Sequence, residues 1–392
     1  MGDPVSSAQR AADYESVDAR RWVQLALGLI WLVDALLQFQ PYMFTRALAT
    51  QVMEPAAAGN PGFVAGPLLA AARIAGHDPV ASNAVFATIQ LAIGLGLLWR
   101  RTVRAALVAS IIWGLLVWWL GEGLGGILAG NPTPVTGAPG AAVLYELITG
   151  LAWPPGRRRL AGGSAAGGSG AGGSGACDGP LGDWARPAWL AVWGSGAYFL
   201  LLTVNQAPSA LGSSLASAAA GEPAWLAALD HSAAVAVGAR GTAVSLGLAA
   251  VFTLIAFGVF TPALSRPLLV LAMVTAMAIW LLGEDLGGIL AGNGTDPNTG
   301  PLLVLLAMTY WPQPAPSRRP SFAAQGRPDN RLADTTLPSA QIRPGRHRVP
   351  SHVPSHRGTA RDLPPWDTPP PWPNLGARDS RRPRPTYRNR GW

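Results

Sequence analysis

Two glutamates recur in a repeated stretch of sequence. Glu122 lies in WWLGEGLGGILAGN (Trp118–Asn131) and Glu284 in WLLGEDLGGILAGN (Trp280–Asn293), which match at 12 of 14 positions with an offset of 162 residues. If the preceding apolar helix continues through this motif, each carboxylate must face protein or a water-filled cavity, where it could bind a cation, a proton or a polar head group. A structural role is equally open, in which each glutamate lies at the outer interface and accepts hydrogen bonds from exposed backbone N–H groups.

The glycines of the motif have small-xxx-small spacing. This spacing permits close contact between helices, and it also permits a broken or re-entrant segment. The first copy matches the pattern GxGxxG, but it follows an apolar helix, and Asp285 replaces the middle glycine in the second copy. The motif therefore does not predict nucleotide binding.

A polar stripe follows the first apolar segment. Gln24, Gly28, Trp31, Asp34 and Gln38 recur at helical spacing and share one face. A carboxylate in mid-span costs about 2.5–3.5 kcal/mol on insertion scales, so Asp34 should have a partner. Arg104 is one candidate partner, and a structural pairing with Gln or Trp is the alternative.

The second half of the chain keeps some polarity but lacks this carboxylate. The residues expected at the equivalent positions are Ser195, Tyr198, Leu201 and Asn205. Glu146, in the fourth apolar segment, likewise corresponds to Val304. We therefore expect a ligand site mainly in the first half, with the second half as a scaffold. The polar or ligand site is predicted to comprise Glu122, Glu284, Asp34, Gln38, Trp31 and Glu146, with no catalytic residue and no metal ligand.

The elements that carry these residues are apolar segments of membrane-spanning type. The chain is 49% hydrophobic and only 13% charged, about half the charged fraction of an ordinary soluble domain. Eight segments approach the roughly 20 apolar residues that cross a bilayer, of which the fourth and eighth are short. They are Trp22–Phe39, Ala81–Trp99, Val103–Leu120, Ala141–Trp153, Ala188–Val204, Thr242–Phe260, Pro267–Leu282 and Pro301–Trp311.

The repeated motif organises these segments into two halves. We predict an all-α membrane protein of two tandem four-helix transmembrane bundles, related by a parallel internal repeat. The predicted parts are a cytoplasmic N-terminal segment (1–21), the first half (22–153), a Gly/Ser-rich linker (154–187), the second half (188–311) and a disordered Pro/Arg-rich tail (312–392). Two moderately apolar patches, Phe63–Gly76 and Ala224–Val237, are expected to lie in the outer interface without crossing.

Charge predicts the orientation and the partners. All 29 basic residues are arginine, and the inner segments of the predicted topology hold most of them. This bias places both termini in the cytoplasm of a multi-pass cell-membrane protein. The arginine-rich tail is expected to attract anionic lipid head groups, while nucleic-acid binding has no supporting feature. We see no cleavable signal peptide, and the one cysteine, Cys177, falls in the linker.

The first-segment stretch GLIWLVDALLQFQPYMF, the repeated WWLGEGLGGILAGN and the later TDPNTGPLL together resemble uncharacterised actinobacterial membrane proteins. These residues are also distantly similar to the DoxX-type four-helix family. That resemblance spans about residues 22–311 and implies a membrane redox role, with quinone as the implied cofactor, although the sequence holds no cofactor motif. It transfers no catalytic residue.

Two function classes remain open at this point. One is a non-catalytic membrane subunit or accessory protein, linked to quinone redox chemistry and to a membrane redox partner. The other is a transporter or channel for a small solute or ion, with its site at the interface of the two halves. Broken helices at both motifs that line a wet cavity would favour transport. Continuous helices with a lipid-facing groove would favour the accessory function.

Overall fold

The computed structural model describes residues 4–154, 184–218 and 221–312. Within these ranges all regular secondary structure is helical, so the all-α expectation is confirmed there. Most of the predicted linker (154–187), all but one residue of the predicted tail (312–392) and the side chains before residue 19 lie outside the described part.

Eight long helices carry the two halves of the sequence. The first half contributes α1 (Pro4–Leu37), α4 (Pro79–Leu98), α5 (Val103–Leu120) and α6 (Ala141–Leu151). The second half contributes α8 (Ala185–Leu200), α11 (Gly241–Gly258), α12 (Ser265–Leu282) and α13 (Thr299–Thr309). Helix α1 packs on α4 and α5 on α6, as α8 packs on α11 and α12 on α13, and α6 and α13 meet between the halves.

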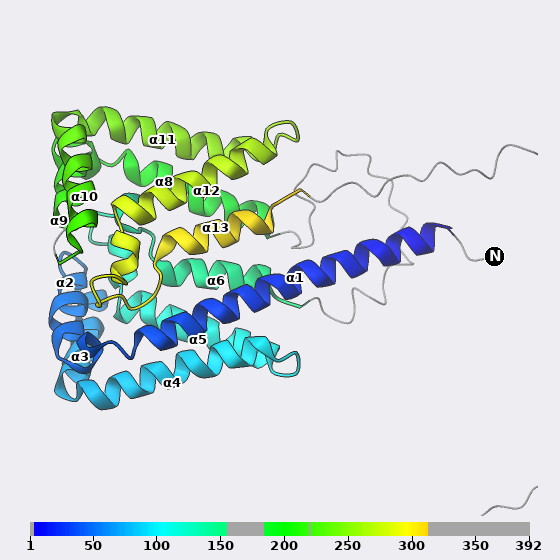
Figure 1. Ribbon diagram of the computed structural model, residues 1–392, viewed down its shortest axis with the longest axis horizontal. Coiled ribbons are helices and arrows are strands. Elements are labelled where there is room, and N and C mark those ends of the chain that lie inside the picture. The colour runs from blue at the N-terminus through cyan, green and yellow to red at the C-terminus, as the bar shows by residue number, and fades with distance from the viewer. Residues whose placement is uncertain (1–3, 155–183, 219–220, 313–392) are drawn as a thin grey trace, which may run out of the picture. The chain divides into compact units, whose positions relative to one another are not determined.

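Other helices lie across one end of these eight. They are α2 (Glu54–Ala56) and α3 (Gly62–His77) in the first half, and α9 (Ala210–Ala218) and α10 (Ala224–Val237) in the second. Figure 1 shows α3, α9 and α10 running crosswise to the long helices. We call this end of the bundle, where the repeated motifs also lie, the crosswise end.

Four stretches are long and apolar enough to cross a membrane. These are Pro79–Leu98, Val103–Leu120, Ala224–Gly258 and Ser265–Leu282, and α6 and α13 are shorter apolar helices of 11 residues each. The third stretch joins α10 to α11, but Gly238 (φ 44°, ψ −129°) interrupts it. Because α10 lies crosswise in Figure 1, only its α11 part runs with the bundle. The lengths and composition are those of a multi-pass membrane protein.

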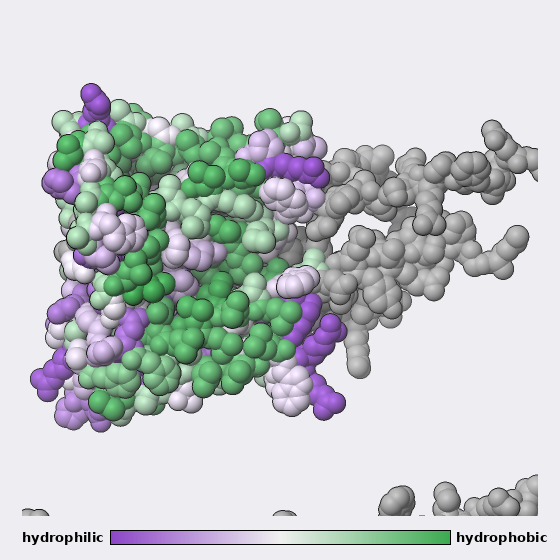
Figure 2. Space-filling model, viewed as in Figure 1, coloured by the Kyte–Doolittle hydropathy of each residue, from purple (hydrophilic) through white to green (hydrophobic). Residues whose placement is uncertain are grey.

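The outward surface of the bundle is suited to lipid. Figure 2 shows a broad apolar band over the long helices, with hydrophilic residues gathered towards both of their ends. The band includes side chains such as Leu95, Ile112, Phe257 and Val274, each 53–64% exposed. A continuous apolar surface of this kind would be unfavourable in water and is favourable against acyl chains. At the end opposite the crosswise helices, five arginines line a cavity: Arg20, Arg21, Arg100, Arg101 and Arg104.

Close packing of α1 on α4 depends on two glycines. A Cβ on Gly28 would lie 3.0 Å from the Cβ of Leu97 and 3.2 Å from the carbonyl oxygen of Gly94. A Cβ on Gly94 would lie 2.8 Å from the Leu32 side chain. Small residues let the two backbones approach, which is the usual basis of helix association in membranes. This contact fixes the side of α1 that carries the polar stripe.

Candidate functional site

Both repeated motifs break the helix that precedes them. Helix α5 ends at Leu120 and α12 at Leu282, and the chain then enters four consecutive left-handed residues. Their φ angles are 56°, 58°, 62° and 71° at residues 123–126, and 49°, 55°, 74° and 66° at residues 285–288. Left-handed backbone costs about 1–2 kcal/mol for residues with a Cβ, which explains the glycines. Of the two arrangements that the glycine spacing allows, the structure has the broken segment.

Each repeated glutamate accepts hydrogen bonds from the start of the next helix. Glu122 Oε1 accepts the backbone N–H of Ala142 at 3.1 Å, at the start of α6. Glu284 Oε2 accepts the N–H groups of Thr299 (3.1 Å) and Gly300 (3.2 Å) at the start of α13, and the Thr299 hydroxyl donates to Oε1. A carboxylate in this place offsets the positive end of a helix dipole. The two glutamates therefore anchor α6 and α13 to the broken segments.

The two glutamates differ in how fully they are satisfied. Both oxygens of Glu284 accept hydrogen bonds, and the residue is 7% exposed. Glu122 Oε2 is buried and has no hydrogen-bond partner. Burial raises the pKa of Glu122 to about 8, and the charges of Asp296 and Glu284 add to that rise against the opposing Ala142 hydrogen bond. Burial also raises the pKa of Glu284 to about 7, although its hydrogen bonds with Thr299 and Gly300 oppose the rise.

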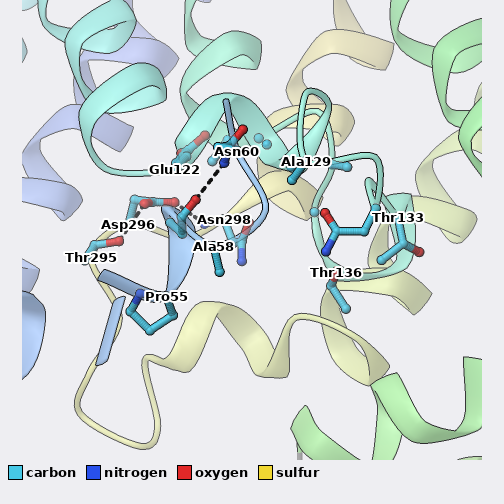
Figure 3. Close-up of a pocket in the computed structure, with 18 residues that line it drawn as sticks. Pro55, Ala58, Asn60, Glu122, Ala129, Thr133, Thr136, Thr295, Asp296 and Asn298 are labelled. Atoms are coloured by element: carbon cyan, nitrogen blue, oxygen red, sulfur yellow. Dashed lines mark hydrogen bonds between the residues drawn. The ribbon is translucent and has the colours of Figure 1, made fainter. Parts of the chain in front are cut away.

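A cavity of about 380 Å³ opens beside Glu122. We call it the outer pocket, and Figure 3 shows Glu122 and Asp296 close together on one side of it with Thr133 and Thr136 on the other. Its walls come from the crosswise segment of the first half, from the first motif and its following loop, and from Thr295, Asp296 and Asn298 of the second half. The two halves therefore build the outer pocket jointly.

The lining of the outer pocket is rich in hydrogen-bond acceptors. Asp296 Oδ1 accepts the N–H of Asn298 at 2.7 Å, and its Oδ2 accepts the Thr295 hydroxyl at 2.8 Å. Asn60 donates its amide N–H to the carbonyls of Ala56 and Gly123, which leaves its Oδ1 buried and unpartnered. Burial raises the pKa of Asp296 above its ordinary value. No arginine or histidine is among the described residues that line the pocket.

Asp34 has a partner that the sequence did not indicate. The Tyr145 hydroxyl, on α6, donates to Asp34 Oδ2 at 2.6 Å, and Asp34 is 1% exposed. The expectation of Arg104 was wrong, because Arg104 lines the cavity at the opposite end of the bundle. The Asp34 carboxyl is close enough to Asp296 for their charges to interact. It therefore lies next to the outer pocket, one layer deeper in the first half.

The remaining stripe residues continue this polar layer along α1. Gln38 donates to the carbonyl of Thr295 (3.2 Å), and Gln24 donates to the carbonyl of Ala152 (2.9 Å). Between them, Trp31 donates to the Ser110 hydroxyl at 3.2 Å. That hydroxyl also hydrogen-bonds the Thr149 hydroxyl at 3.1 Å. We call the set Gln24, Trp31, Asp34, Gln38, Ser110, Tyr145 and Thr149 the polar seam. From Gln24 to Gln38 it extends about 21 Å along the helix.

Glu146 stands apart from the outer pocket. It lies on α6, partly buried against Gly114 of α5, where a Cβ would collide with its carboxyl group. Neither of its buried oxygens has a hydrogen-bond partner in the described part of the chain. Of the six predicted site residues, only Glu122 lines the outer pocket. Trp31, Asp34 and Gln38 belong to the polar seam, Glu284 anchors the start of α13, and Glu146 lies against Gly114 of α5.

The expected counterparts of the stripe in the second half were misplaced. Tyr198 and Leu201 are 61% and 54% exposed, whereas Trp31 and Asp34 are buried. Extending the motif offset of 162 residues to α8 pairs Trp31 with Trp193 and Asp34 with Gly196, both of which are buried. The same offset relates α5 to α12 and the starts of α3 and α10.

Three lining or partner residues were not predicted as site residues. Tyr145, Asn60 and Asp296 all lie outside the repeated motif, and Asp296 accepts the backbone N–H of Asn298 two residues further on. Tyr145 could have been noticed from the repeat, because its counterpart on α13 is the apolar residue Leu303. Asn60 and Asp296 line the outer pocket because loops far apart in the sequence pack together, which the sequence alone does not indicate.

Comparison of the chain with known proteins identifies no relative. No protein-family model, no curated protein and no solved structure matches the chain. Among the described residues, no group of three or more His, Cys, Asp or Glu side chains is placed to hold a metal ion.

Proposed function

We propose that this chain is a multi-pass cell-membrane protein that arose by duplication of a four-helix unit, and that it transports a small cation. The cation binds in the outer pocket between the halves and moves along the polar seam of the first half. The observation that carries this proposal is the outer pocket itself, where Glu122 and Asp296 converge without a basic residue.

The acidity of the pocket region selects the charge of the solute. The charge of Asp296 raises the pKa of both Glu122 and Glu284, and the charge of Glu284 raises that of Glu122. Asp34 is near enough for its charge to interact with that of Asp296. Several carboxylates at low dielectric repel, so they must share protons or bind a positive ligand. The unpartnered oxygens of Glu122 and Asn60 favour a ligand that carries N–H donors. An organic ammonium or guanidinium ion of a size suited to a cavity of about 380 Å³ meets both conditions.

The polar seam supports movement beyond the pocket. Polar and ionisable residues inside a membrane are costly and usually belong to a substrate or proton pathway. The seam joins the outer pocket, through Gln38 and Asp34, to the end of α6 at Ala152. The arginine-lined cavity lies at that second end.

The competing function is a non-catalytic subunit or accessory protein linked to quinone chemistry, as the DoxX-type resemblance implies. That function predicts helices that continue through both motifs and a groove that faces lipid. An apolar groove is present between α1 and α4, but the helices are not continuous. The breaks after Leu120 and Leu282, and the shared polar pocket beside the first of them, favour transport instead. Membership of the DoxX-type family stays a prediction.

The proposed orientation places the outer pocket outside the cell and both termini inside. It is supported by the arginines that gather at the end opposite the crosswise helices. Cys177, the only cysteine, provides a test, because a membrane-impermeant maleimide should label it only after the cells are permeabilised. Labelling of intact cells would reverse the orientation.

Binding in the outer pocket can be tested directly with simple cations. We expect methylammonium or guanidinium to raise the thermal unfolding temperature of the purified protein. Glu122→Gln should weaken binding about tenfold or more, since a hydrogen bond to a charged group contributes about 1.5–3 kcal/mol. Glu54→Gln is the matched control, because Glu54 is an exposed carboxylate near the pocket rim. An equal loss of cation affinity in both variants would show that the effect comes from surface charge in general and not from the outer pocket.

A further inference from the structure

A second cavity lies on the lipid-facing side of the first half. It has a volume of about 510 Å³ and lies between α1 and α4, beneath the turn that follows α1. Its apolar walls include Leu32, Leu36, Phe39, Phe44, Ala87 and Leu91. Leu36 and Phe39 are 68% and 67% exposed, so the cavity is part of the apolar surface. We call it the lateral groove.

Two buried amides give the lateral groove a polar end. Gln38 and Asn83 are among its lining residues, and they are 3% and 2% exposed. Gln38 donates its amide N–H to the Thr295 carbonyl, and Asn83 donates to the Gln38 carbonyl at 2.7 Å. These donations fix the orientation of both amides. Their oxygens, Gln38 Oε1 and Asn83 Oδ1, are buried and accept no hydrogen bond from the described residues.

Unmatched acceptors in an apolar groove specify the ligand. A buried acceptor without a partner is unfavourable, so it favours a molecule that brings a hydroxyl or amine donor. No arginine or histidine is among the described lining residues, so nothing in the groove would pair with a phosphate. The apolar walls suit a hydrocarbon body.

The position of the amides sets the direction of that ligand. Asn83 lies near the start of α4, and Gln38 follows the end of α1, so both are at the crosswise end of the bundle. Leu32 and Leu91 lie six and eight residues farther along their helices, which is about 9–12 Å. A molecule in the groove therefore has its donor group at the membrane interface and its hydrocarbon towards the membrane centre, as an outer-leaflet lipid has.

We infer that the lateral groove binds one neutral lipid with a hydroxyl head group, of the diacylglycerol type, through Gln38 and Asn83. The lipid hydroxyl donates to the amide oxygens, and the acyl chains cover Leu36 and Phe39. This binding stands independently of a cation in the outer pocket.

Native mass spectrometry of the delipidated protein tests the inference, with dioleoylglycerol, dioleoylphosphatidylglycerol and a menaquinol added separately. We expect dioleoylglycerol to bind in a 1:1 ratio and more tightly than the other two. Asn83→Leu should weaken it about fivefold, as expected for one neutral hydrogen bond. Ala87→Trp fills the groove and should weaken it at least tenfold. Val85→Trp, an exposed position on the same helix outside the groove, should leave it unchanged.

Three results would overturn the inference. Equal binding of phosphatidylglycerol would show that the head group is not selected. Preference for menaquinol would assign the groove to a redox ligand. A protein dimer that Ala87→Trp dissociates would assign it to a second copy of the chain. Circular dichroism of each variant separates these outcomes from loss of fold.

Discussion

The two halves share an arrangement of helices but have different interiors. In the first half, Asp34 and Tyr145 form a buried polar pair beside Ser110 and Thr149. By the motif offset of 162 residues, Asp34 and Ser110 correspond to Gly196 and Ala272. By the alignment of Glu146 with Val304, Tyr145 and Thr149 correspond to Leu303 and Ala307. The ring of Phe252 lies against Gly196, where an added Cβ would be 2.5 Å from it.

Aromatic packing replaces the polar seam in the second half. Trp193 packs against Phe252 with ring centroids 5.0 Å apart, and Trp189 packs against Tyr310 at 4.7 Å. The Trp189 indole donates to the Ile255 carbonyl at 3.0 Å. Because an apolar interior supports the same helix arrangement, the fold does not require the polar seam. The cost of the seam in the first half supports the proposed function, and we propose that the aromatic core of the second half serves as a scaffold.

Removing the aromatic core should have the largest effect on stability. Trp193→Ala deletes a fully buried indole and should lower the free energy of unfolding by about 3–5 kcal/mol. Thermal unfolding in detergent would measure this. Trp31→Phe is the comparison: it keeps the aromatic packing on Tyr145 but removes the donor to Ser110, and should cost about 1 kcal/mol. A larger loss from Trp31→Phe than from Trp193→Ala would reject the scaffold role of the second half.

Substitution of the two repeated glutamates should have different effects on stability and on cation binding. Glu284 accepts three hydrogen bonds at the start of α13 and Glu122 accepts one at the start of α6, so Glu284→Gln should destabilise by roughly 2 kcal/mol and Glu122→Gln by less. Cation binding should follow the opposite order, since Glu122 lines the outer pocket. Chemical denaturation and a binding titration of both variants measure the two effects. Equal effects of the two variants in both assays would contradict the assignment of Glu284 to helix anchoring and of Glu122 to cation binding.

The broken segments contain glycines of unequal importance. Gly125 and Gly130 are both left-handed, but a Cβ on Gly125 would collide with the Pro139 carbonyl, whereas nothing lies within 4 Å of one on Gly130. Gly130→Ala should cost only the backbone strain of about 1–2 kcal/mol. Gly125→Ala should cost more and displace the loop that lines the outer pocket. If both variants unfold at the same temperature, the loop does not pack on the motif.

The pH dependence of stability should follow the raised pKa values of the two repeated glutamates. The raised pKa of Glu122, about 8, means that its contribution is fully present below the unfolded pKa near 4.5 and is lost as pH rises through 8. Glu284 follows the same direction through about 7. Glu122→Gln should flatten the upper part of the unfolding-temperature profile. A profile that rises between pH 5 and 8 would contradict these shifts.

The sequence predicts the helices better than it predicts the site. Hydrophobic length and the repeated motif indicate the long helices and the crosswise positions of residues 63–76 and 224–237, because both signals are local. Asp34 was recognisable as a polar residue on a buried face, but its pairing with Tyr145 depends on the packing of α1 against α6. Asp296 joins Glu122 only because a loop of the second half folds over the first. No local pattern encodes that contact.

Electrical recording on proteoliposomes tests the division of roles between the halves most directly. Concentration jumps of guanidinium and of protons on a solid-supported membrane report charge that moves through the protein. The wild type should give currents for at least one of these cations, Glu54→Gln should match it, and Asp34→Asn should abolish the sustained current. Asp34→Asn should still bind the cation in the outer pocket, as measured by the rise in its unfolding temperature. Sustained wild-type currents in Asp34→Asn would contradict a path through the first half.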